Sequence, residues 1–164
     1  MDMGIGVYYV YVAGKYAYLG IKRGGLNEFQ IVDVSNVSSP KNVSGIDFGY
    51  PSVYVNKIVV SGKYAYVTNG AVAGTCSSAD STGCEVRILD ISNISSPTFV
   101  GGIDLAISTD RVYVVGKYLY VTNDIIAGTC DTTTATGCEF RIYDISNPAS
   151  PVFVNGLDRA ISTE

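Results

Sequence analysis

Four cysteines are the most reactive side chains in this chain of 164 residues, and they fall in two matching pairs. Cys76 lies eight positions before Cys84, and Cys130 lies eight positions before Cys138. Both pairs begin after Gly-Thr and end after Thr-Gly, whereas the residues between them are small, polar and otherwise different. A loop whose ends stay constant while its middle varies is typical of a loop closed by a covalent bond. The spacing therefore favours two disulfides, each within its own loop.

Two other interpretations of the cysteines are free thiols and a metal site. Structural zinc sites usually have closer cysteine spacing and often include histidine, and this sequence contains no histidine. We therefore expect no metal and no cofactor. Because disulfides persist in oxidising compartments, the pairs predict an extracellular or cell-surface protein. The first residues lack the features of a signal peptide, so either a leader has been removed or the sequence is part of a longer chain.

Carboxylates are the other residues that could do chemistry, because a ring of aspartates could line a channel and bind Ca²⁺. Two sets of aspartates recur at matching places: Asp33, Asp90 and Asp144, then Asp47, Asp104 and Asp158. The close spacing of oxygen ligands in a calcium loop is absent from both sets. The first set opens the motif Asp-x-Ser-Asn, whose side chains accept hydrogen bonds from nearby backbone amides. We expect these aspartates to form turns.

Several classes of function are excluded by what the sequence lacks. It has no Gly-x-Ser-x-Gly motif, no phosphate-binding loop and no isolated pair of carboxylates, so we expect no catalytic residues and no enzyme activity. Charged residues make up 16% of the chain, the net charge is −4, and no basic patch is present, which argues against nucleic-acid binding. No apolar stretch approaches the roughly 20 residues that span a bilayer.

These residues belong to a unit that is repeated three times within a single domain, residues 1–164. Each unit has a Gly-Lys-Tyr segment, the Asp-x-Ser-Asn motif, a Ser-Pro and a Gly-Ile/Leu-Asp. The units cover approximately residues 5–52, 53–109 and 110–164. The second and third units are longer than the first by the loop that contains the cysteines. Residues 160–164 repeat residues 106–110, so the sequence ends where a further unit would begin.

Within each unit the patterns predict four short strands, and no segment has a helical period. In the first unit the strands are expected at residues 7–12, 16–19, 28–34 and 42–46. The third strand alternates most clearly, with Phe29 and Ile31 on one face and Glu28 and Gln30 on the other. The proline before the fourth strand fits an outer, edge position. Four-stranded antiparallel units in tandem are the blades of a β-propeller, so the expected fold class is all-β and propeller-like.

The repeated phrases also resemble a known family. Gly-x-Tyr-Ala-Tyr, the strand that ends Ile-Val-Asp-Val-Ser-Asn at Asn36, Ser-Pro and Gly-Ile-Asp are similar to the LVIVD repeat of bacterial and archaeal surface-associated proteins. The resemblance covers essentially the whole chain in three copies and implies a propeller-like fold at the cell exterior. Two features depart from the family. Proline after the Asn of the motif occurs only at Pro148, with Val37 and Ile94 in its place earlier, and the cysteine loops are additions.

Three blades do not make a closed ring, since propellers typically have four or more. Open blade edges favour pairing with another chain, and head-to-tail contact either closes into a ring or continues as a filament. The sequence thus predicts a non-catalytic extracellular structural or adhesive protein that forms a homo-oligomer or polymer of itself. The alternative is a ligand-binding propeller module that recognises a glycan or a protein through the cysteine loops and is a fragment of a longer surface protein.

Overall fold

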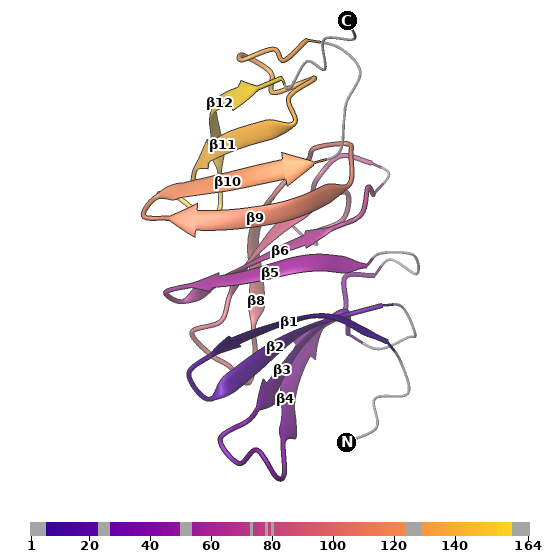
Figure 1. Ribbon diagram of the computed structural model, residues 1–164, viewed down its shortest axis with the longest axis vertical. Coiled ribbons are helices and arrows are strands. Elements are labelled where there is room, and N and C mark those ends of the chain that lie inside the picture. Colours follow the sequence, from indigo (N-terminus) through magenta and orange to yellow (C-terminus); the bar gives the residue numbers. More distant parts are fainter. Residues whose placement is uncertain are drawn as a thin grey trace, which may run out of the picture.

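The computed structural model describes residues 6–22, 27–49, 54–72, 74–77, 79, 81–123 and 129–158, and within them it contains twelve strands and no helix. The first sheet consists of β1 (Val7–Ala13), β2 (Tyr16–Ile21), β3 (Phe29–Asp33) and β4 (Lys41–Ile46). The second consists of β5 (Val55–Ser61), β6 (Tyr64–Asn69), β7 (Val86–Asp90) and β8 (Thr98–Ile103). The third consists of β9 (Thr109–Val115), β10 (Tyr118–Asn123), β11 (Phe140–Asp144) and β12 (Val152–Leu157). The predicted all-β, propeller-like fold is confirmed (Figure 1).

Each sheet is an antiparallel meander in which neighbours along the chain are also neighbours in the sheet. The first hairpin of each blade turns on the Gly-Lys pair. Gly14, Gly62 and Gly116 have φ values of 59°, 59° and 57°, a conformation that residues with a Cβ rarely adopt. Glycine at the first central position is what a type II′ hairpin turn requires. The Gly-Lys segment therefore recurs because the turn depends on it.

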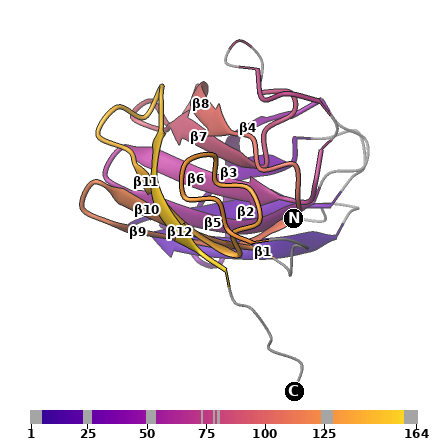
Figure 2. The same ribbon diagram turned by 90° about the horizontal axis from the view of Figure 1, so that it is seen from above.

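The three sheets stack along the long axis of the molecule, with β1, β5 and β9 side by side along one side (Figures 1 and 2). The fourth strands, β4, β8 and β12, are therefore the outer edges of their sheets. A proline directly precedes each of them, at Pro40, Pro97 and Pro151. The predicted edge position of these strands is correct, since a residue without an amide hydrogen does least harm there.

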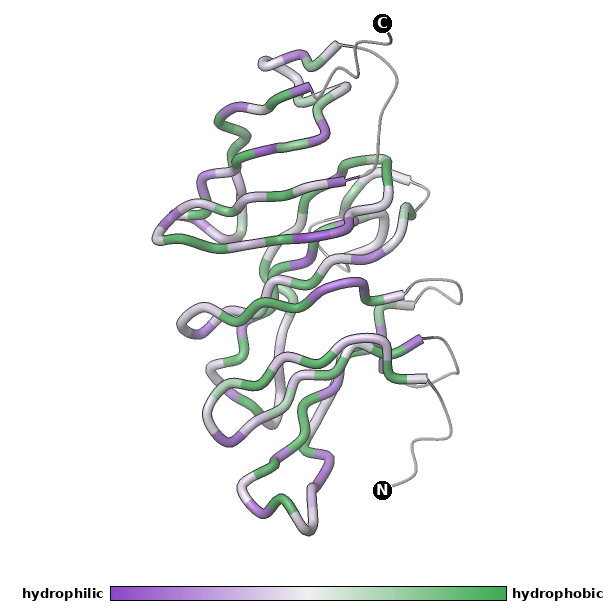
Figure 3. The backbone as a smooth tube through the Cα atoms, viewed as in Figure 1, coloured by the Kyte–Doolittle hydropathy of each residue, from purple (hydrophilic) through white to green (hydrophobic). Residues whose placement is uncertain are grey.

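Two hydrophobic clusters hold the stack together, one at each contact between blades. The first joins Tyr18, Phe29 and Ile31 of the first blade to residues of the second, and the next cluster joins the second blade to the third. We call the surface of a blade that packs on the following blade its forward face, and the surface that packs on the preceding blade its rear face. Hydrophobic residues lie along the strands of all three sheets, including the first and the last (Figure 3).

The Asp-x-Ser-Asn motif forms the same turn after β3, β7 and β11. In each copy the serine amide donates a hydrogen bond of 2.8 Å to Oδ1 of the preceding aspartate: Ser35 to Asp33, Ser92 to Asp90, and Ser146 to Asp144. The asparagine accepts in the same way from the residue two positions further on. The turn predicted from the motif is thus confirmed in all three blades.

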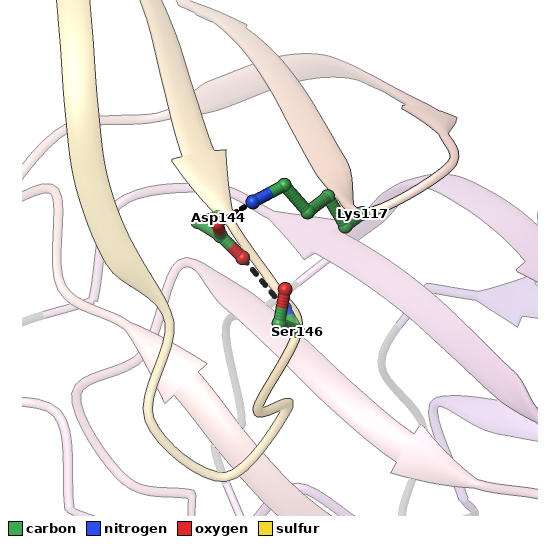
Figure 4. A network of polar contacts seen from close by, with 3 residues as sticks. All are labelled: Lys117, Asp144 and Ser146. Atoms are coloured by element: carbon green, nitrogen blue, oxygen red, sulfur yellow. Dashed lines mark hydrogen bonds and ion pairs between the residues drawn. The ribbon is translucent and has the colours of Figure 1, made fainter.

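Two of these turns are strengthened by a charge from the hairpin, and in the second blade Nζ of Lys63 lies 3.5 Å from Oδ2 of Asp90. Nζ of Lys117 lies 2.8 Å from Oδ2 of Asp144, while the amide of Ser146 binds the other oxygen (Figure 4). These hydrogen bonds from Lys117 and Ser146 lower the pKa of Asp144 from 3.8 to about 2. The carboxylate is thus favoured in its charged form in the folded protein.

Asp144 should make the stability of the fold depend on pH in the acid range. Because its pKa is lower in the folded protein than in the unfolded chain, its contribution is present above pH 3.8 and is lost as the pH falls towards about 2. Urea unfolding across this range should show a shallower loss of stability for Asp144→Asn than for the native chain. Lys117→Met, which keeps the serine contacts, should give an intermediate slope. An unchanged slope in Asp144→Asn would contradict this assignment.

Candidate functional site

The two cysteine loops are closed by disulfides, Cys76–Cys84 and Cys130–Cys138, with Cα atoms 4.3 Å apart in each. The described residues of the two loops also make matching hydrogen bonds. The Ser77 amide donates to the Thr82 carbonyl at 2.7 Å, and the Asp131 amide donates to the Thr136 carbonyl at 2.8 Å. The two loops therefore share this backbone hydrogen bond between matching positions. Free thiols are absent among the described residues, and so is any group of three His, Cys, Asp or Glu placed to hold a metal.

Each disulfide rests against the outer strand of its own blade. Cys84 and Cys138 are fully buried. A Cβ placed on Gly102 of β8 would lie 2.6 Å from Sγ of Cys84, and one on Gly156 of β12 would lie 2.9 Å from Sγ of Cys138. These glycines are needed because sulfur occupies the space of a side chain. The sequence analysis missed this role, although the glycine before Ile/Leu-Asp recurs in every unit.

The third strand of each blade buries polar side chains on its rear face. Gln30, Arg87 and Arg141 are 3%, 0% and 2% exposed. Nη1 of Arg87 donates to the Asn69 side chain, and Nη1 of Arg141 donates to Asn123. The alternation of this strand marks two faces correctly, and in the second blade both faces are inside the molecule. A buried guanidinium is tolerated only where it has hydrogen-bond partners, which the asparagine at the end of the second strand provides.

A buried glutamate ties the cysteine loop to the connection between blades. The Glu85 carboxylate accepts hydrogen bonds from the amide of Val72, after β6, at 2.9 Å and from the amide of Leu105, after β8, at 2.7 Å. Glu28 plays the same part in the first blade, where it accepts from the amide of Phe48 at 2.7 Å. Burial raises the pKa of Glu85 despite these donors. Backbone amides thus replace the water that the carboxylate loses.

Two aspartates of the second set, Asp47 and Asp104, also form turns. Oδ1 of Asp47 accepts from the Gly49 amide at 2.7 Å, and Oδ1 of Asp104 accepts from the Ala106 amide at 3.1 Å. The other oxygen of Asp104 accepts from the Cys76 amide at 3.2 Å, which attaches the disulfide loop to the same turn. Asp158 directly follows β12. These contacts agree with the turn role expected from the sequence.

The largest difference between the blades lies in what covers their faces. In the first blade, Val10 and Val12 on the rear face are 54% and 60% exposed, whereas Ile58, which corresponds to Val10 in the second blade, is fully buried. In the third blade, Tyr113 and Leu157 on the forward face are 66% and 64% exposed. The uncovered surfaces at the two ends of the stack are therefore sheet faces. The sequence analysis expected open blade edges, and pairing through them stays a prediction; the exposed residues named above lie on β1, β9 and β12, which are edge strands of their sheets.

The fold and these surfaces define a repeat protein of the propeller class, built from three blades with a cystine loop in the second and third. The LVIVD repeat model matches residues 7–47, 54–72, 82–104, 108–126 and 135–158, and the chain belongs to this family. The match is continuous in the first blade and is interrupted at the cystine loop in the other two. The loops are thus additions to the family pattern, as the sequence indicates. The comparison with curated proteins gave no match.

The described part of the chain has no helix of the length and apolar character needed to cross a membrane.

Removing one disulfide should lower stability without disturbing the fold. The double variant Cys130→Ser/Cys138→Ser should unfold at a lower urea concentration, with a loss of roughly 2–3 kcal/mol, because the closed loop restricts the unfolded chain. Cys76→Ser/Cys84→Ser should lose a similar amount, since the loops have equal length. Thr132→Ala, at an exposed position within the third-blade loop, is the control and should change little. A loss in the control equal to that in the cysteine variants would contradict the prediction.

Proposed function

We propose that this protein is a non-catalytic, extracellular structural or adhesive repeat protein whose copies assemble head-to-tail through the two uncovered blade faces. The observation that carries the proposal is the correspondence between these faces and the faces that pack together inside the chain. Each internal contact joins a forward face to a rear face, and the chain leaves one of each uncovered. The occupant that fits both is a second copy of the same chain.

The forward face of the third blade repeats the forward face of the first. In the first sheet, Tyr11, Tyr18 and Ile31 form one row across the strands. The corresponding row of the third sheet is Tyr113, Tyr120 and Ile142. The first row packs against the second blade. The later row has the same side chains in the same order, so it suits the same kind of partner surface.

The rear face of the first blade likewise repeats the rear face of the second. Ile58, Val67, Val60, Ala65 and Leu89 of the second blade contact the first blade. The corresponding residues of the first blade are Val10, Leu19, Val12, Ala17 and Val32. All are aliphatic and similar in size. Val10 and Val12 are 54% and 60% exposed, whereas Ala17 and Val32 are already buried, so the surface still to be covered lies along β1. Burying apolar surface is favourable at roughly 25 cal/mol per Å², so these exposed valines favour association.

Three specific contacts across the internal boundary indicate the register of the assembly. The Tyr11 hydroxyl donates to the Val60 carbonyl at 3.4 Å, and the Ser44 hydroxyl donates to the Ile94 carbonyl. Nζ of Lys57 lies 4.8 Å from the centre of the Tyr9 ring. Each contact links a side chain of one blade to the blade that follows it.

The ends of the chain carry matching groups for each of these contacts. Tyr113 corresponds to Tyr11 and would reach Val12 of the next copy, while Asn155 corresponds to Ser44 and would reach Val37. Val37 corresponds to Ile94 in the repeated turn and is 86% exposed. Arg111 corresponds to Tyr9 and would meet Tyr9 of the next copy, an arginine–aromatic pair in place of lysine–aromatic.

The location and the absence of catalysis are supported by the chemistry of the chain. Both cystine loops suit an oxidising compartment. The acidic side chains have structural roles. The carboxylates of Asp33, Asp90 and Asp144 accept hydrogen bonds within turns, and the carboxylate of Glu85 accepts one from a backbone amide. The disulfide-closed loops and the small number of charged residues suit a stable assembly.

The two faces can be blocked separately. Val12→Asp places a charge on the rear face, and Tyr113→Asp places one on the forward face. Light scattering at rising concentration should give multimers for the native chain and monomers for either variant, because each variant keeps only one usable face. An equimolar mixture should form a one-to-one complex of about twice the chain mass of 17.4 kDa. Thr132→Asp, on an exposed loop position, is the charge-matched control and should assemble like the native chain.

Two results would count against the proposal. A native chain that stays monomeric at high concentration would overturn self-assembly. Variants that still pair with themselves would show a symmetric contact instead of a head-to-tail one, because a forward–forward or rear–rear pair needs only one kind of face. The size of the native particle then distinguishes a closed ring from a filament.

A further inference from the structure

A pocket of about 280 Å³ opens on the forward face of the third blade, where β9 lies beside β5. It is lined by one row of the sheet, in which Arg111 of β9, Thr122 of β10 and Phe140 of β11 are directly paired. Tyr113 and Tyr120, which are paired in the neighbouring row, also line it. The pocket thus brings three aromatic rings, a hydroxyl and a cation together on an uncovered face.

The equivalent place on the first blade is filled by the second blade. The corresponding row there is Tyr9, Gly20 and Phe29. A Cβ added to Gly20 would lie 2.5 Å from Cγ1 of Val55, which is fully buried. Thr122 stands where the first blade has this glycine, so it brings a side chain into the space that Val55 uses. A second copy would meet that side chain, and this row is the part of the forward face that departs from the internal contact.

The pocket carries positive charge that is not neutralised by a described carboxylate. Arg111 is exposed, and Lys57 of β5 lines the pocket beside it. The lysines of the second and third hairpins pair with aspartates of the turns, whereas neither Lys57 nor Arg111 forms an ion pair with a described residue. The Lys57 ammonium lies 4.8 Å from the centre of the Tyr9 ring, so Arg111 is the cation that an entering ligand meets. In a chain of net charge −4, such a place indicates a site for an anionic group.

The aromatic side chains give the pocket an ordered apolar surface. Tyr113 is 66% exposed. Tyr120 and Phe140 are half-buried, and their rings stack with centres 6.1 Å apart and planes 18° from parallel. The Thr122 side chain is exposed and adds a hydroxyl that can donate or accept. A ligand that suits these groups has one apolar face, several hydroxyls and a negative charge.

We propose that this pocket binds an acidic saccharide, a hexuronate, whose carboxylate pairs with the Arg111 guanidinium while its sugar ring lies against Tyr113. Arginine matches a carboxylate with two parallel hydrogen bonds, and the C–H face of a sugar ring is apolar enough to cover a tyrosine ring. A free hexuronate and a hexuronate unit of a polysaccharide share this chemistry. The site lies on the sheet and not in the cysteine loops, where the sequence placed glycan recognition. The inference does not rest on self-assembly, although a second copy would use the same face.

An NMR titration of Val12→Asp tests the inference, because this variant keeps the forward face uncovered whether or not the native chain assembles. Galacturonate should shift the amide signals of Arg111, Tyr113 and Thr122, with a dissociation constant on the order of 1 mM for so small a ligand. Galactose, which has no carboxylate, should bind roughly 10-fold more weakly. Trigalacturonate forms a second arm. Tighter binding of the trimer points to a polysaccharide as the natural source, and equal binding points to the free sugar.

Three further substitutions, each added to Val12→Asp, separate the contributions. Arg111→Gln should weaken the binding of galacturonate roughly 10-fold and leave that of galactose unchanged. Tyr113→Ala should weaken the binding of both sugars, because both use the ring. Lys41→Gln, which removes an exposed cation from the first blade, is the matched control and should bind galacturonate as Val12→Asp alone does. All three positions are exposed, so the fold should be retained.

Four results would overturn the proposal. They are saturating galacturonate without shifts, equal binding of galacturonate and galactose, unchanged binding in Arg111→Gln, and tighter binding of benzoate than of galacturonate. The last result would show a site for an aromatic acid. A native chain that stays monomeric would leave all of these measurements unaffected, so the saccharide site and the proposed assembly fail separately.

Discussion

The second blade depends on its neighbours because the middle strands of its sheet are buried on both faces. In β7, the residues from Val86 to Leu89 are all buried, although their side chains point alternately to opposite sides. Hydrogen bonds within the sheet satisfy the backbone, but they cannot keep water from two faces at once. A single four-stranded sheet of this composition would expose a large apolar surface, so the unit is stable only within a stack.

The second consequence of stacking is that charge lies between the blades. Arg87 and Glu85 are fully buried in the second blade, and each has a defined set of partners from another segment. Losing one partner of a buried charge is more costly than losing an exposed ion pair. The asparagine at the end of the second strand and the connection between blades are therefore constrained as strongly as the apolar core, although both lie outside it.

Much of this architecture can be predicted from the residues alone. The hairpin glycines, the Asp-x-Ser-Asn turns and the alternation of the third strand are local features, and local features determine strands and turns directly. The disulfide pairing follows from spacing within one loop. What the sequence does not reveal depends on contacts between segments far apart in the chain. The burial of Arg141, the attachment of Val72 and Leu105 to Glu85, and the exposure of Val12 and Tyr113 at the ends all arise only when blades stack.

The glycine beneath each sulfur has a consequence for how the family pattern can vary. The same row of the first sheet contains Gly45, where an added Cβ would lie 2.7 Å from the Asn27 side chain. In the first blade, the space that a disulfide would need beside this glycine is occupied by the side-chain amide of Asn27. A loop of the second-blade type could be transplanted there by exchanging Asn27 and its neighbours, with no change in the outer strand. Blades with and without a disulfide loop therefore share the same glycine-lined space on the outer strand.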